Sequence, residues 1–216
     1  MKRRPILFFI NKLNKPAFTT GELAAVSGKS SSAVTQALNY LCEQGIIFKV
    51  YRGLWAQAYD KSISPYAVIS YLFPKHRAYV SFISALRFYG IVEQVPQIIT
   101  LASTAHTKKI NTKIGVFSVH HIGANFFKGF DWYKETGSFL IAQQEKALVD
   151  CLYISSCKKR QFRHFPELHF PKTFSFSKAR KWAESITDAK NRQNVQNRLE
   201  EIINANPISK KRFNKR

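Results

Sequence analysis

The sequence has few cysteines and no long hydrophobic run. Its three cysteines, Cys42, Cys151 and Cys157, form an odd and sparse set, which fits reduced thiols rather than a disulfide framework. No stretch approaches the roughly 20 apolar residues that a membrane-spanning helix needs. The apolar run of residues 6–10 is also shorter than the hydrophobic region of a signal peptide, which takes about 7 to 15 residues. We therefore expect a soluble, cytoplasmic protein.

Acidic side chains are scarce as well, with 13 against 34 lysines and arginines, so the net charge is +21. Because small domains typically carry a net charge of about 2 to 8 in magnitude, this excess predicts a polyanionic partner, and nucleic acid fits better than a membrane surface. Residues 151–216 are the most basic part, with 16 basic and 5 acidic side chains. The 45% apolar content is enough for one large domain or two modest ones.

The first 45 residues predict three short helices. Apolar side chains recur at helical spacing in residues 6–13, and Asn14 and Pro16 end that helix. Thr19 stands three residues before Glu22, which is the spacing of a capping box and predicts the start of a second helix. The serines of residues 30–32 predict the cap of a third helix, which Gly45 ends.

Residues 46–51 and 54–58 are two β-rich runs that flank Arg52 and Gly53, so they predict a hairpin with Arg52 at its tip. Three helices followed by such a hairpin are typical of a winged helix-turn-helix, in which the third helix reads DNA. The side chains expected to read base edges in the major groove are Ser31, Ser32, Thr35, Gln36 and Asn39. Those expected to hold phosphates are Arg3, Arg4, Lys29, Lys49 and Arg52, the last with access to the minor groove. The alternative is a helical module whose hairpin makes protein contacts.

A second domain is predicted to begin after a polar connector at residues 60–64. Ser64 and Pro65 start a helix that stops at Pro74, and Ser81 caps a further helix that Gly90 ends. Residues 97–103 and 113–122 predict an antiparallel strand pair, joined by an exposed loop that carries Lys108 and Lys109. A strand at 138–142 precedes a helix at 143–154, and residues 174–206 predict two more helices.

The expected fold class is therefore α+β. It consists of a winged helix-turn-helix at residues 1–60, a mixed domain of helices and strands at 64–205, and a basic helical tail that ends in residues 206–216. Whether the basic C-terminal region holds DNA, RNA or a protein is left open by the sequence.

Several side-chain groups contain residues that can bind metals or catalyse reactions, but we assign none of them as a metal or catalytic site. Glu145 and Asp150 lie about 140° apart around a helix and do not converge on one ion, whereas Lys146 and Asp150 fit a plain i,i+4 ion pair. Cys151, Cys157, His164 and His169 are possible zinc ligands, but their spacing matches no common zinc motif. The aromatic residues at 126–133 are expected to pack in the core, with base stacking as the alternative.

Two segments behind the winged helix carry a family resemblance. They are S-x-x-S-A-L-x-x-Y-G at Ser81–Gly90 and I-A-x-x-E-K-A-L-x-D at Ile141–Asp150. In their order and spacing, residues 20–155 resemble the AbiEi-type antitoxins of bacterial type IV toxin–antitoxin systems. Many of these relatives have a proline at the position of Gln144, a difference that concerns the start of the helix rather than its chemistry.

The resemblance implies a non-enzymatic repressor without a cofactor, whose winged helix binds inverted repeats in its own promoter. It also implies that the C-terminal domain counters a nucleotidyltransferase-like toxin, which the neighbouring gene encodes, without forming a stable complex with it. Two alternatives remain open. One is a nuclease or RNA-modifying enzyme that is targeted by a winged helix, and the other is a ligand-sensing transcription factor unrelated to a toxin.

Overall fold

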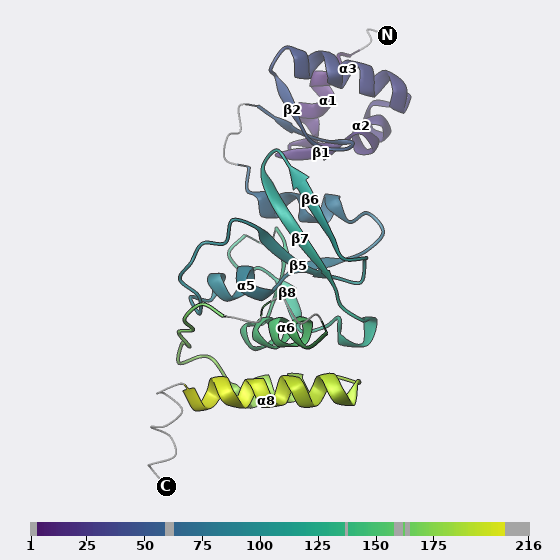
Figure 1. The fold of residues 1–216 in the computed structure, drawn as a ribbon. Helices are drawn as coiled ribbons and strands as arrows, with labels where there is room; N and C mark the ends of the chain where they lie inside the picture. The colour runs from purple at the N-terminus through teal and green to yellow at the C-terminus, as the bar shows by residue number, and fades with distance from the viewer. Residues whose placement is uncertain (1–3, 59–62, 137, 158–161, 163–164, 206–216) are drawn as a thin grey trace. The chain divides into compact units, whose positions relative to one another are not determined.

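The structure, a computed structural model, describes residues 4–58, 63–136, 138–157, 162 and 165–205 (Figure 1). Its contacts divide the chain into two compact units, one of Met1–Lys75 with Ile110–Val116 and one of His76–Lys109 with Phe117–Arg216. The first unit thus includes the helical segment after the predicted connector, and Tyr71 of that segment shares a hydrogen bond with Lys15. None of the helices in the described residues is both long and apolar enough to cross a bilayer.

The three predicted helices of the first unit are present: α1 (Ile6–Leu13), α2 (Thr20–Ser27) and α3 (Ser31–Glu43). The capping box is confirmed, because the Thr19 hydroxyl accepts from the Glu22 amide at 3.1 Å and the Glu22 carboxylate accepts from the Thr19 amide at 2.8 Å. At α3 the cap is Ser30, whose hydroxyl accepts from the Ala33 amide at 3.2 Å. Local hydrogen bonds therefore set where α2 and α3 begin.

The predicted hairpin is confirmed, and it belongs to a three-stranded antiparallel sheet in the order β1-β3-β2. The strands are β1 (Ala17–Thr19), β2 (Ile47–Tyr51) and β3 (Leu54–Gln57), and β1 was not predicted from the sequence. Gly53 has a φ of +66° at the turn, a conformation that favours glycine. The sheet and the helices enclose a core made of Ile6, Ile10, Phe18, Leu23, Val34, Leu38, Leu41, Ile47 and Trp55.

The segment that follows the winged helix was predicted to be one α-helix, but only its second half is α-helical. It begins as a 3-10 helix, η1 (Pro65–Val68), and continues as α4 (Ile69–Leu72). The Ser64 hydroxyl caps it as expected by accepting from the Tyr66 amide at 3.3 Å.

A six-stranded mixed sheet in the order β6-β7-β5-β4-β9-β8 lies mostly in the second unit, whereas the turn of its β6-β7 hairpin, Ile110–Val116, belongs to the first. In chain order the strands are β4 (Ala78–Val80), β5 (Ile99–Ser103), β6 (Lys108–Thr112), β7 (Gly115–His121), β8 (Phe130–Trp132) and β9 (Leu140–Ala142). Of these, β9 was predicted, whereas the three-residue strands β4 and β8 were not.

One predicted pairing is wrong. Strands β5 and β7 pair in parallel, with Ile99 opposite Phe117, and not as an antiparallel pair. The polar segment between them is not only a loop, because it contains strand β6, which leads through a two-residue turn into β7. The extra strand reverses the chain once more, so β7 returns in the direction of β5.

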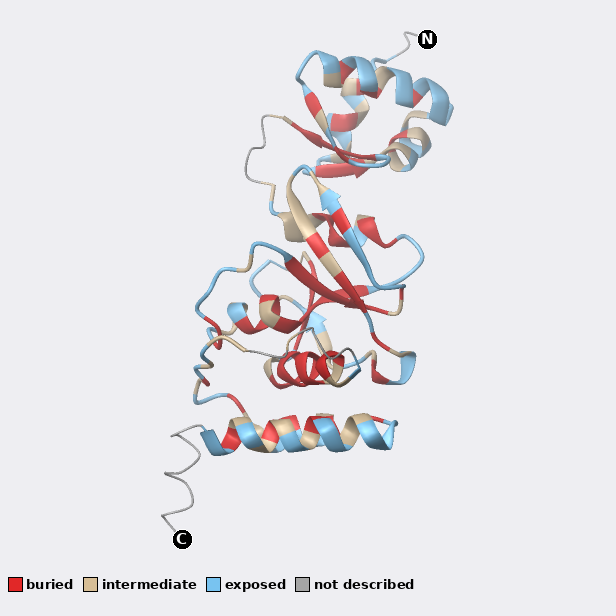
Figure 2. Cartoon of the chain, in the orientation of Figure 1, coloured by how far each residue is buried: buried red, intermediate tan, exposed pale blue. Residues whose placement is uncertain are grey.

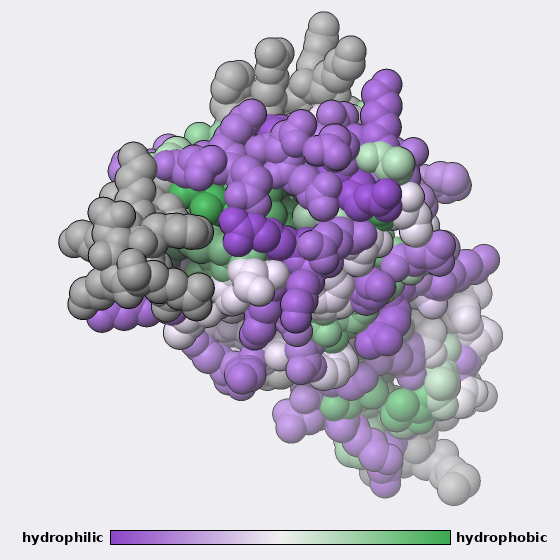
Figure 3. Space-filling model, turned by 90° about the horizontal axis from the view of Figure 1, so that it is seen from below, coloured by the Kyte–Doolittle hydropathy of each residue, from purple (hydrophilic) through white to green (hydrophobic). Residues whose placement is uncertain are grey.

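Four helices pack in the second unit: α5 (Phe82–Phe88), α6 (Gln144–Cys157), α7 (Phe176–Glu184) and α8 (Ala189–Ala205), and a short 3-10 helix, η2, covers Ala124–Phe126. Helix α6 contacts the other three and is buried along most of its length, whereas α8 alternates buried and exposed residues (Figure 2). Val195, Leu199 and Ile203 form the buried stripe of α8. Seen from the side on which α8 lies, the surface is mostly hydrophilic (Figure 3).

Candidate nucleic-acid interface

Helix α3 has one buried and one exposed face. Val34, Leu38 and Leu41 anchor it in the core of the winged helix. The opposite face carries all five side chains predicted to read bases, and each is exposed: Ser31, Ser32, Thr35, Gln36 and Asn39. These residues lie in the first two and a half turns, the part of a recognition helix that contacts base edges in helix-turn-helix proteins. The structure therefore brings this predicted set together on one surface.

One further side chain on this face was missed by the sequence reasoning. Tyr40 is 62% exposed, although large aromatic residues tend to be buried. It follows Gln36 by four residues, so the two side chains lie one above the other on the helix. The same helical spacing that identified Gln36 and Asn39 would have found Tyr40, whose hydroxyl can donate to a phosphate or a base edge.

The predicted phosphate-binding residues come from different elements. Arg4, which precedes α1, is exposed, and its guanidinium lies 4.5 Å from the centroid of the Phe8 ring. Lys49 of β2 is exposed with its ammonium 5.4 Å from the Trp55 ring centroid, and Arg52 is exposed at the tip of the hairpin. Lys29 is half-buried before α3, whereas Arg3 lies outside the described residues.

The wing has a neighbour that the sequence did not predict. The backbone amide of Lys113 donates to the carbonyl of Val50 in β2 at 3.3 Å, and Lys113 itself is exposed. This contact joins the turn between β6 and β7 to the outer strand of the winged-helix sheet. Since Lys113 is more than 60 residues from β2 in the sequence, no local pattern links the two. The backbone of Lys113 thus lies beside β2, and Lys113 is a further exposed lysine of this unit.

Not every cation of the winged helix is available to phosphate. The Lys15 ammonium donates to the Glu22 carboxylate at 2.7 Å. Partial burial favours the neutral form of Glu22, but the hydrogen bonds from Lys15 and Thr19 outweigh it and lower the pKa of that carboxyl. The same bond raises the pKa of Lys15. This pair therefore stabilises the start of α2.

In the second unit, the two motifs of the family resemblance meet in one buried cluster. The Ser81 hydroxyl donates to the Asp150 carboxylate at 2.7 Å, and the Tyr79 hydroxyl donates to the same oxygen at 3.0 Å. The Lys146 ammonium forms an ion pair with the other oxygen of Asp150 and lies 3.8 Å from the Phe126 ring centroid. Ser81 was predicted to cap α5 with its side chain, but it makes no such hydrogen bond. Its hydroxyl donates to Asp150 instead.

The ion pair between Lys146 and Asp150 is as predicted, but its setting is not. Both side chains are fully buried, whereas i,i+4 pairs usually lie at the surface of a helix. Burial lowers the pKa of Lys146 and raises the pKa of Asp150, and their mutual attraction opposes both shifts. Because these groups are closed off from solvent, the cluster holds the unit together and offers no surface to a substrate.

The other candidate metal and catalytic groups do not come together in the structure. Glu145 accepts from the Ser175 amide at 2.9 Å, so it and Asp150 have different partners. Cys151 is buried, Cys157 is exposed, and His164 lies outside the described residues. Within the described ranges, no group of three histidine, cysteine or acidic side chains is arranged to hold a metal ion. Of the aromatic residues, Phe126 is buried as expected, whereas Trp132 is 52% exposed.

Comparison with known proteins supports the N-terminal assignment. No curated protein matches the sequence significantly. Residues 6–56, which extend from α1 to the last strand of the hairpin, match the family model described as "Transcriptional regulator, AbiEi antitoxin". The match covers the winged helix and confirms the resemblance there, while the motifs of the second unit lie beyond it. Over residues 6–56 the chain is thus similar to the AbiEi antitoxin type of transcriptional regulator.

Proposed function

We propose that this protein is the antitoxin of a type IV toxin–antitoxin system and a repressor of its own promoter. The observation that carries the proposal is the exposed polar face of α3 within a module that matches the AbiEi regulators. Gln36 and Asn39 would read base edges in the major groove of inverted repeats, with Ser31, Ser32 and Thr35 beside them. The role is non-enzymatic.

Affinity in this proposal comes mainly from cations outside α3. The helix itself has no lysine or arginine, so Arg3, Arg4, Lys29, Lys49 and Arg52 would supply the phosphate contacts, with Lys113 as an addition. Such contacts position a protein on DNA without reading its sequence. Specificity and affinity would then reside in different side chains, which makes them separable by mutation.

A gel-shift assay on the promoter of the protein's own gene tests this division. The double variant Gln36→Ala/Asn39→Ala should lose discrimination between the promoter and unrelated duplex DNA, at about 1 to 3 kcal/mol for each lost base contact. Lys49→Ala/Arg52→Ala should weaken binding to both duplexes to a similar degree. Asn11→Ala, an exposed change on α1, is the control. Undiminished discrimination by the α3 variant would refute the proposed reading face.

The antitoxic half is tested by co-expression. If the second unit counters a nucleotidyltransferase-like toxin encoded by the neighbouring gene, the full chain should relieve growth arrest by that toxin. The Gln36→Ala/Asn39→Ala variant should relieve it equally well, because repression and neutralisation would lie in different units. Persistent growth arrest in the presence of the folded chain would rule out the antitoxin role and favour a ligand-sensing regulator.

A further inference from the structure

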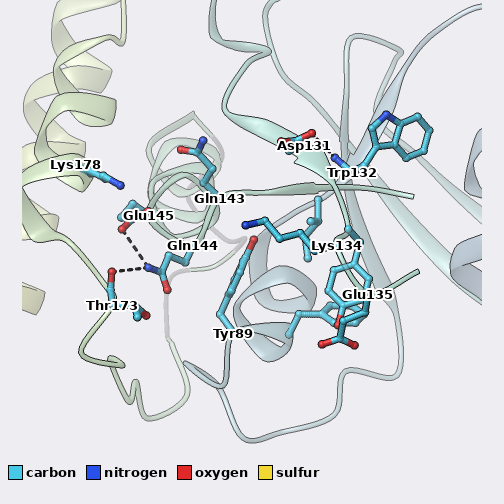
Figure 4. A pocket seen from close by; sticks show the side chains of 13 residues that line it. Tyr89, Asp131, Trp132, Lys134, Glu135, Gln143, Gln144, Glu145, Thr173 and Lys178 are labelled. Carbon is cyan, nitrogen blue, oxygen red and sulfur yellow. Dashed lines mark hydrogen bonds between the residues drawn. The ribbon is translucent and has the colours of Figure 1, made fainter. Parts of the chain in front are cut away.

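The second unit contains an open pocket that the proposed function does not use (Figure 4). Its volume is about 560 Å³, within the range of about 300 to 1,000 Å³ that is usual for small-molecule sites. The end of α5, the segment from β8 to Glu135, the start of α6, and residues 173–178 line it. Four parts of the chain that are distant in sequence thus form its walls.

One wall is aromatic and rigid. Phe88, Tyr89 and Tyr133 contribute half-buried rings, and the centroids of the Phe88 and Tyr133 rings are 5.0 Å apart. Tyr133 also stacks on Phe139 with 4.9 Å between centroids. The Tyr89 hydroxyl donates to the carbonyl of Ala142 at 2.8 Å, which fixes the position of its ring. A planar, apolar ligand therefore has a preformed surface to pack on.

The acidic side chains of the pocket are already engaged. Glu145 accepts from the Ser175 amide at 2.9 Å and from the Gln144 side-chain amide at 3.3 Å. Asp131 accepts from the Trp132 amide at 2.7 Å, and Glu135 accepts from the Tyr133 hydroxyl. Each carboxylate therefore has a donor in the wall of the pocket itself.

The two lysines of the pocket are in the opposite situation. Lys134 and Lys178 are exposed, and in the described part of the chain the ammonium group of neither makes an ion pair or a hydrogen bond. In Figure 4 the Lys134 side chain extends across the pocket, while Lys178 extends from α7 toward Glu145. Gln143 is exposed at the pocket, and its amide can both donate and accept. Two cations and an amide are thus available to a ligand in this pocket.

We propose that this pocket binds a nucleotide. The base would pack on the wall of Phe88, Tyr89 and Tyr133 and be read by the Gln143 amide, and the phosphate would be held by Lys134 and Lys178. A planar base and an anionic phosphate match an aromatic wall beside uncommitted cations. The nucleotide is either free in solution or an unpaired nucleotide of a single strand. This inference does not depend on promoter binding by the winged helix.

Calorimetric titration of the full chain tests the proposal with two probes. The first is the set of four ribonucleoside 5′-monophosphates, and the second is an eight-nucleotide single-stranded RNA of mixed sequence. Binding of a monophosphate indicates a free nucleotide, and binding of the RNA alone indicates a strand. If neither probe binds, the proposal is overturned.

Matched charge variants locate the binding. Lys134→Ala/Lys178→Ala should lower the affinity for the probe by about tenfold or more, since a hydrogen bond to a charged group contributes roughly that factor. Lys181→Ala/Lys190→Ala removes the same charge at two exposed positions outside the pocket and should leave binding nearly unchanged. Equal weakening by both pairs would indicate general attraction to a basic protein and overturn the site. Gln143→Ala should level the preference among the four bases, and an unchanged ranking would remove the base-reading role.

Discussion

At the scale of single residues, the buried ion pair of α6 is the most consequential contact. Lys146 and Asp150 are both fully buried, and Asp150 holds Ser81 and Tyr79 as well. Such a pair contributes little compared with well-packed apolar side chains, but removing one partner leaves an uncompensated charge in the interior. Its value therefore depends on all members being present.

Lys146→Met should destabilise the protein by about 3 to 5 kcal/mol, because Asp150 would remain buried without its counterion. The double variant Lys146→Met/Asp150→Leu should recover a large part of that loss, since no charge is then left in the core. The free energy of unfolding in urea measures both. A double variant as unstable as the single one would show that the hydrogen bonds of Asp150 with Ser81 and Tyr79, rather than charge compensation, stabilise the unit.

A titrating residue gives a prediction in acid. The pKa of Glu22 is lowered in the folded protein, so its capping and pairing contributions are fully present above its ordinary value of 4.5. They are lost as the pH falls below that value and through the folded pKa, since the carboxylate is then protonated. Denaturation of Glu22→Gln should be less dependent on pH over this range than that of the wild type. Identical pH profiles for the two proteins would contradict this role.

At the scale of elements, what could be predicted from the sequence depended on how local the signal was. The boundaries of α2 and α3 followed from Thr19, Glu22 and the serines before α3, because caps bind amides within three residues. Strands β1, β4 and β8 were missed because three residues do not reveal an alternating pattern, whereas β9, which is as short, was predicted as part of the longer run at residues 138–142. Their existence depends on partners far away in the chain.

The candidate sites divide in the same way. The exposed polar face of α3 could be predicted because helical spacing alone determines which side chains share it. Lys113 beside β2, and the pocket between α5, β8 and α6, could not be predicted. They arise from contacts between segments tens of residues apart, which no local pattern reveals. The antiparallel pairing predicted for β5 and β7 was also wrong, so the order of strands in the sheet could not be derived from the sequence.

Adjacent serines of α3 should have separate roles. Ser30→Ala should cost about 1 kcal/mol of stability, because it removes the side-chain cap to the Ala33 amide. Ser31→Ala should leave thermal unfolding nearly unchanged, since Ser31 is exposed and is not the cap, but it should weaken promoter binding. Thermal unfolding and gel shift on both variants measure the two roles. Equal stability of the two variants would contradict the assignment of Ser30 as the cap.

At the scale of the whole molecule, the basic residues all lie outside helix α3. If six to eight phosphates are neutralised, the logarithm of the affinity for DNA should fall with the logarithm of salt concentration at a slope of about −5 to −7. Titrations between about 50 and 200 mM salt measure this slope. Lys49→Ala should make it shallower by about 1. A slope near zero would show that the charge of +21 serves another partner.

The burial of α6 has a consequence for the order in which the protein becomes functional during synthesis. The elements that cover α6 include α7 and α8, which end only at residue 205, whereas α1 to β3 of the winged helix are complete by residue 57. Since domains generally fold as units from the N-terminus, the core of the second unit cannot close until nearly the whole chain has left the ribosome. A nascent chain that stalls or is cut before α8 would carry a folded winged helix attached to an exposed apolar helix. Such a fragment is a natural target for chaperones and proteases.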